Sequence, residues 1–154
     1  MSIHVGTAPD SWGVWAASDP LQTPWPRFLD EVFESGYAAI ELGPFGYLPT
    51  DPQYVSDELA RRSLQLAGGT IASNLSAPNG WGAMRETTAS VCAILAHLGA
   101  RFVVVLDSGN KGQRELDEPG WARLRETVHR LESRVIAEGH DLRAMRDRLD
   151  RGDR

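Results

Sequence analysis

The sequence has little cysteine, no basic run before the C-terminus and no long apolar run, and each absence excludes a class of protein. Among 154 residues Cys92 is the one cysteine, so no disulfide can form within the chain. Cys92 lies on the apolar side of a predicted helix, where we expect a buried structural thiol and not a nucleophile. Lysine and arginine number 16 against 21 acidic residues, and the net charge of −5 disfavours nucleic acid and anionic membranes as partners.

Membrane and secretion signals are also missing. No apolar segment approaches the roughly twenty residues that a membrane-spanning helix requires. Residues 2–6 alternate like a strand and do not resemble a secretory leader. We therefore expect no membrane partner and a cytoplasmic location.

The motifs of several common enzyme classes do not occur. The sequence contains no G-x-G-x-x-G fingerprint, no Walker-type phosphate loop, no G-x-S-x-G elbow and no metal-binding pair of cysteines. The histidines are predicted to lie apart: His4 in a strand, His97 and His129 in helices, and His140 just after a helix. A metal site needs three or four converging ligands, so the sequence predicts no metal ligand in this chain.

The chain does contain one repeated pattern: a short apolar strand, a loop and an amphipathic helix. The predicted strands cover residues 3–7, 38–42, 65–71 and 102–106. The predicted helices run from the Thr23 cap to Gly36, from the Asp51 cap to about residue 63, from the end of the 72–82 loop to Gly99, and up to Gly139. The loops after the strands are the longer ones, which is typical of enzymes whose function lies in those loops.

Some finer predictions concern packing. Pro24 is expected to be the first helical residue after Thr23, and the apolar stripe of this helix runs from Trp25 to Phe33. Trp121 lies on the stripe of the last helix, so we expect both tryptophans in the core. The strand at 102–106 is continuously apolar, which fits a parallel strand covered on both faces.

Taken in order, several blocks of sequence resemble one enzyme family: GTAPDSWGVW, AAIELGPFGYLPTDP, LAGGT and LDEPGWARL. They are similar to the sugar phosphate isomerase/epimerase family of xylose isomerase-like TIM barrels, and the likeness spans residues 3 to about 140. The resemblance implies proton transfer next to a carbonyl of a sugar or polyol, assisted by a divalent metal, Mn²⁺ or Mg²⁺. It places the family's metal ligands beyond residue 140, so we assign no metal ligand and no catalytic residue here.

Side chains at the ends of the predicted strands are candidates for substrate binding. Glu41 ends the second strand and could bind sugar hydroxyls or assist proton transfer, or it could accept bonds from backbone amides of a neighbouring loop. After the first strand, Asp10 could accept bonds from hydroxyls, and Trp12 could stack on a sugar ring or plug the barrel end. Asp107 ends the fourth strand, although Asp-Ser-Gly-Asn is also common turn chemistry. Thr70, after two glycines, is the weakest candidate for the same pocket.

The repeat favours an α/β fold: four consecutive parallel βα units that form half of a (β/α)8 TIM barrel. Residues 1–140 are then the N-terminal half of the barrel, and residues 141–154, rich in arginine and aspartate, form a charged helical or disordered tail. In this arrangement the first and last strands are open edges and the inner face meets water, which favours self-association.

The leading functional hypothesis is a truncated sugar isomerase/epimerase-like protein that is inactive alone and does not bind the metal by itself. A lyase of the inosose dehydratase type is an alternative, because that reaction also begins with removal of a proton next to a carbonyl. Another is a non-catalytic half barrel that binds a partner or pairs with a second copy in an eight-stranded ring. A flavodoxin-like domain is disfavoured because no phosphate-binding loop accompanies the strands.

Overall fold

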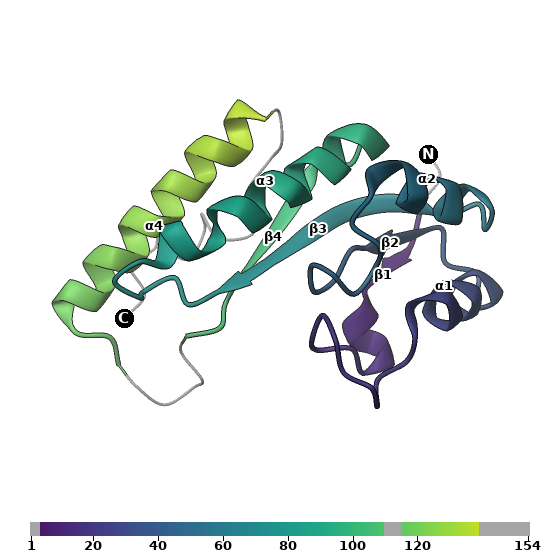
Figure 1. Cartoon of the computed structure of the whole chain (residues 1–154), viewed down its shortest axis with the longest axis horizontal. Helices are drawn as coiled ribbons and strands as arrows, with labels where there is room; N and C mark the ends of the chain where they lie inside the picture. Colours follow the sequence, from purple (N-terminus) through teal and green to yellow (C-terminus); the bar gives the residue numbers. More distant parts are fainter. Residues whose placement is uncertain (1–3, 110–114, 139–154) are drawn as a thin grey trace.

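The computed structural model describes residues 4–109 and 115–138, and its strands and helices alternate along the chain (Figure 1). The strands are β1 (Gly6–Thr7), β2 (Ala39–Glu41), β3 (Gln65–Ser73) and β4 (Phe102–Asp107). The helices are α1 (Trp25–Glu34), α2 (Pro52–Ala60), α3 (Gly80–Leu98) and α4 (Glu118–Ala137), with a short 3-10 helix, η1 (Pro9–Trp12), after β1. The predicted α/β class with consecutive βα units is confirmed. The predicted tail at 141–154 lies outside the described residues.

The strands form one parallel sheet in the order β1-β2-β3-β4. The pairing shifts at the end of β2, where Ile40 lies opposite Leu66 but Glu41 lies opposite Gly68. The extra residue in β3 is a bulge, which re-aims the side chains that follow it. This irregularity falls beside Glu41, the leading site candidate.

The helices cover one face of the sheet. A Cβ atom built on Gly69 of β3 would lie 2.6 Å from Cγ1 of Val91 and 3.3 Å from Cδ2 of Leu95, so Gly69 faces α3 and permits its close approach. Helices α2 and α4 pack in turn against α3 (Figure 1). Because side chains alternate along a strand, Thr70 faces away from α3.

On the other face of the sheet no helix among the described residues covers β4, and we call this face the open face. In β4, Val103 and Val105 are buried, whereas Phe102 is 45% and Leu106 is 51% exposed. The prediction that both faces of this strand are covered is therefore wrong. A continuous apolar strand indicates that both of its faces avoid water. No described residue covers the second face of β4.

Several predicted helix ends are confirmed. Oδ1 of Asp51 accepts a hydrogen bond from the backbone N–H of Tyr54 at 2.7 Å, so Asp51 caps α2. Gly36 and Gly99 adopt φ values of 81° and 71° just after α1 and α3, the left-handed conformation that ends helices. Helix α3 starts at Gly80, earlier than the predicted end of its preceding loop.

The predicted start of α1 is wrong. Its N-cap is Pro24, in extended conformation with φ −62° and ψ 142°, and the helix starts at Trp25 with Pro26 in the first turn. The hydroxyl of Thr23 does not cap the helix, because it donates to the carbonyl oxygen of Trp12 at 3.4 Å. Strand β1 is also shorter than predicted, since its partner β2 spans only 3 residues.

The aromatic residues of two apolar stripes are less buried than predicted. Trp25 is partly buried against the core, but Phe33 is 53% and Trp121 is 38% exposed. Trp121 lies in the first turn of α4, and helix side chains there point back beyond the helix start. The prediction that Trp121 belongs to the core is therefore wrong.

Candidate functional site

The candidate site is centred on Glu41 at the carboxyl end of β2. Oγ1 of Thr70, from the adjacent strand β3, donates a hydrogen bond to Oε2 of Glu41 at 3.2 Å. Both side chains lie on the open face of the sheet, because the bulge in β3 places Thr70 beside Glu41 and opposite in direction to Gly69. Thr70 is only 8% exposed and Glu41 is half-buried. The bond therefore fixes a partly desolvated carboxyl group at the strand ends.

The carboxyl group of Glu41 holds its proton more tightly than an ordinary glutamate. Burial raises its pKa, and the nearby negative charge of Asp10 adds to that increase. The hydrogen bond from Thr70 acts in the opposite direction and lowers the pKa. A partly desolvated carboxyl group with a raised pKa suits proton transfer or the binding of hydroxyl groups.

Asp10 lies in η1, directly after β1, and its side chain is exposed. Its backbone carbonyl accepts a hydrogen bond from Gly13 N–H at 2.9 Å, and Gly13 adopts a φ of 75° that favours glycine. Asp10 lies close enough to Glu41 for its charge to raise the pKa of that carboxyl group, and Thr70 is bonded to Glu41, so three of the predicted site residues meet at this end of the sheet.

Trp12 makes packing contacts. Its ring meets those of Phe28 and Tyr37 edge-on, with centroid distances of 5.2 and 6.2 Å. Its indole N–H donates to Oε2 of Glu31 at 2.8 Å, and Arg27 holds the other carboxylate oxygen of Glu31 at 2.6 Å. These contacts fix the Trp12 ring by packing, and its stacking on a sugar stays a prediction.

Asp107 is engaged by backbone amides. Its Oδ1 accepts hydrogen bonds from the N–H groups of Leu75 and Gly109, each at 3.1 Å. The bond to Gly109 is the turn that the Asp-Ser-Gly sequence favours, and the bond to Leu75 ties the end of β4 to the loop after β3. One oxygen of Asp107 thus has a structural task, and substrate binding by this residue stays a prediction.

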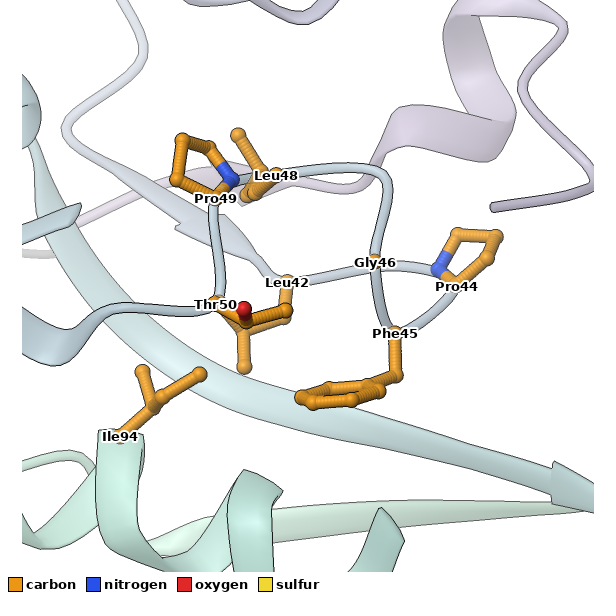
Figure 2. A pocket seen from close by; sticks show the side chains of 8 residues that line it. All are labelled: Leu42, Pro44, Phe45, Gly46, Leu48, Pro49, Thr50 and Ile94. Atoms are coloured by element: carbon orange, nitrogen blue, oxygen red, sulfur yellow. The ribbon is translucent and has the colours of Figure 1, made fainter. Parts of the chain in front are cut away.

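Sequence analysis overlooked a shallow hollow beside the loop after β2. Figure 2 shows its lining, which encloses an empty volume of about 180 Å³ including space open to solvent. The lining residues are Leu42, Pro44, Phe45, Gly46, Leu48, Pro49, Thr50 and Ile94. None of them is a predicted site residue. The closely spaced glycines and prolines of this loop were the signal for a shaped surface, but the contribution of Ile94 from α3 required the tertiary structure.

The described residues do not fit a complete divalent metal site. Within residues 4–109 and 115–138 no three side chains of histidine, cysteine, aspartate or glutamate converge in a way that could hold a metal ion. In this described part of the chain, Glu41 and Asp10 are two oxygen donors that no third such side chain joins.

No protein-family model and no curated protein sequence matches this chain. Solved structures do match it. A xylose isomerase domain protein from Alicyclobacillus acidocaldarius gives a TM-score of 0.65 at 18% identity, covering 92% of this chain and 49% of that one. D-psicose 3-epimerase from Clostridium cellulolyticum H10 gives 0.63 at 13% identity, covering 89% of this chain and 50% of that one. The fold is half of a xylose isomerase-like barrel.

The half barrel spans about half the length of the solved structures that it matches. A family 2 AP endonuclease from Brucella melitensis also matches, with a TM-score of 0.64 at 13% identity and coverage of 91% of this chain and 54% of that one. Identities this low show the fold alone, and enzymes with unrelated reactions share this fold. The predicted resemblance is confirmed at the level of the fold.

No helix in the described part of the half barrel combines the length and the apolar character that crossing a bilayer requires.

Proposed function

We propose that the chain forms one wall of the sugar- or polyol-binding pocket of an isomerase/epimerase-like protein. Glu41 carries the proposal, because it is a half-buried carboxyl group with a raised pKa at the carboxyl end of a barrel strand. In (β/α)8 enzymes the ligands bind at this end of the strands. Thr70 orients Glu41, and Asp10 supplies a second carboxylate for the hydroxyl groups of the ligand.

The composition of the site supports a neutral ligand. Two carboxyl groups accept hydrogen bonds from sugar hydroxyls, whereas they would repel a phosphate or a carboxylate. The chain as a whole carries a net charge of −5, which also argues against the nucleic-acid substrate of an endonuclease. One of the matched structures, D-psicose 3-epimerase, was solved with D-tagatose, which suggests ketohexoses as the first ligands to test.

The chain alone is expected to have no turnover. A divalent metal would polarise the carbonyl group of the sugar, and the described residues supply too few ligands to hold it. Glu41 can still bind hydroxyls and exchange a proton with them. We therefore separate ligand binding, which this chain performs, from catalysis, which requires further residues.

Binding is tested by NMR titration of the 154-residue chain with D-tagatose and D-fructose, with gluconate as the charged comparison. The amide signals of residues around Glu41 should shift with the ketoses and not with gluconate, and Glu41→Gln should weaken binding about tenfold, the loss of one charged hydrogen bond. Glu34→Gln is the matched control, because Glu34 is exposed on α1. Equal binding by the two variants, or no ketose binding, contradicts the proposed pocket.

Catalysis is tested on the same sample with Mn²⁺ or Mg²⁺ added. Ketose and aldose products are separated by chromatography, and loss of water is followed in parallel because a dehydratase would begin with the same proton removal. Metal-dependent turnover by the isolated chain would overturn the view that it is inactive alone.

A further inference from the structure

Both outer strands of the sheet have unpaired edges. Within the described residues β1 pairs with β2 alone and β4 with β3 alone. The longer edge is β4, and its sequence FVVVLD contains no lysine, proline or glycine. Soluble proteins usually protect an exposed edge strand with charges, prolines or bulges. The edge of β4 therefore has the sequence of a covered strand.

Exposed apolar side chains of the sheet lie at these same edges. Val5, just before β1, is 57% exposed, and Phe102 and Leu106 of β4 are 45% and 51% exposed. On the open face of the inner strands the side chains are Thr70, which is 8% exposed, and the half-buried Glu41. The uncovered apolar surface thus lies at the edges of the sheet. Apolar surface in this position marks an interaction site.

We propose that a second copy of this chain covers this surface and that the two copies close an eight-stranded parallel ring. A twofold axis along the ring would place β4 of each copy beside β1 of the other. This one operation pairs every strand edge, keeps all strands parallel and turns the two open faces toward each other. The inference rests on the proposed function, because the cluster of Glu41 and Thr70 faces the interior of the ring and is incomplete without an opposite wall.

The matched structures and the topology of the sheet favour a second copy as the occupant. This chain covers 49% and 50% of two matched structures, so about half of each such fold lies outside the part that resembles this chain, and a second set of four βα units is the partner that would complete it. A strand added at β4 must run parallel to it, and β1 of a second copy does so under the twofold axis. Closure into a ring also removes both edges without leaving a new one, which limits the assembly to two copies.

Multi-angle light scattering over a hundredfold dilution tests the pairing. The expected mass is twice the 16.9 kDa of the chain at every concentration. Leu106→Lys places a charge on the open face of β4 and should yield a monomer with an unchanged circular-dichroism spectrum. Phe33→Lys is the matched control, because Phe33 is 53% exposed on α1, and it should leave the pair intact. A monomeric wild-type chain, or equal effects of the two substitutions, overturns the inference.

Hydrogen exchange of the wild-type chain tests the geometry without any substitution. In the ring, the β4 amides that point away from β3 are protected by the strand of the other copy, so every amide from Val103 to Leu106 should exchange slowly. Fast exchange at alternate amides in a dimer would indicate faces stacked without edge pairing, and larger assemblies would indicate contacts that do not close. Both results overturn the ring.

The two proposals can fail separately. A pair that forms but binds no ketose overturns the proposed function and leaves the ring standing. A monomer that binds D-tagatose through Glu41 overturns the ring and leaves the proposed function standing.

Discussion

The hydrogen bond between Thr70 and Glu41 gives a pH-dependent prediction. Thr70→Val removes the hydroxyl donor and keeps the shape of the side chain, so it leaves no cavity. The bond of 3.2 Å is long for a hydroxyl that donates to a carboxylate. The free energy lost with this bond should therefore be smaller than the usual value for a hydrogen bond to a charged group. We expect Thr70→Val to lower the free energy of unfolding by about 1 kcal/mol at pH 7. That corresponds to a fall in Tm of roughly 2–4 °C for a chain of this size.

The cost of Thr70→Val should grow with pH. Burial already raises the pKa of Glu41 above its value in the unfolded chain, so the group stabilises the fold most when protonated and less as pH rises through its folded pKa. The hydroxyl of Thr70 opposes this increase by lowering the pKa. Without the hydroxyl the folded pKa of Glu41 rises further, and more stability is lost between acidic and neutral pH.

Urea denaturation followed by tryptophan fluorescence at pH 4 and pH 7 measures this difference. The matched control is Thr88→Val, because the hydroxyl of Thr88 donates to the carbonyl oxygen of Met84 at 2.9 Å within α3 and meets no titrating group. Its cost should be the same at both pH values. A cost of Thr70→Val that does not change with pH, or that keeps its pH dependence in the Glu41→Gln background, would refute the reasoning.

Further predictions concern packing and two ionisable groups. Gly69→Ala should destabilise the fold by about 1–3 kcal/mol in urea denaturation, because its Cβ would lie 2.6 Å from a methyl group of the buried Val91 in α3. Gly82→Ala at the start of α3 should cost less, because its Cβ would meet the side chain of Asn79, which is exposed and can turn away. Arg62→Met should cost about 1 kcal/mol at pH 7, because Glu58 is 6% exposed and loses one of its two 2.7 Å ion pairs, while Arg61 keeps the other. Arg62 lowers the pKa of Glu58, so the part of this cost that comes from Glu58 should decline as pH falls through that pKa. Burial raises the pKa of Tyr47 from 10.0 to about 12, so stability should decline as pH rises across that interval, and Tyr47→Phe should remove the decline in alkaline denaturation.

The repeat of strands and helices could be predicted because its signals are local. The cap at Asp51 and the glycines Gly36 and Gly99 act within a few residues, and apolar periodicity acts within one helix. The start of α1 was predicted wrongly because the Thr23 hydroxyl bonds to Trp12, which is 11 positions away. Local patterns cannot reveal such a competing partner.

The candidate site shows the same division. The sequence placed Glu41, Asp10 and Asp107 at strand ends, because chain direction and strand length decide that position. It could not show that a bulge in β3 brings Thr70 to Glu41, since register depends on the contacts between strands. Nor could it show that Trp12 gives its N–H to Glu31.

The sequence by itself therefore determined the alternation of elements, the parallel sheet that follows from it, and the set of polar residues at the strand ends. Only the tertiary structure decided which of those residues meet, how burial changes the pKa of Glu41, and that one apolar face of β4 is left uncovered. The physical reason is the distance along the chain over which each effect acts. Helix and strand propensity and helix capping act between neighbouring residues, whereas desolvation, strand register and the covering of a sheet face depend on segments that folding brings together.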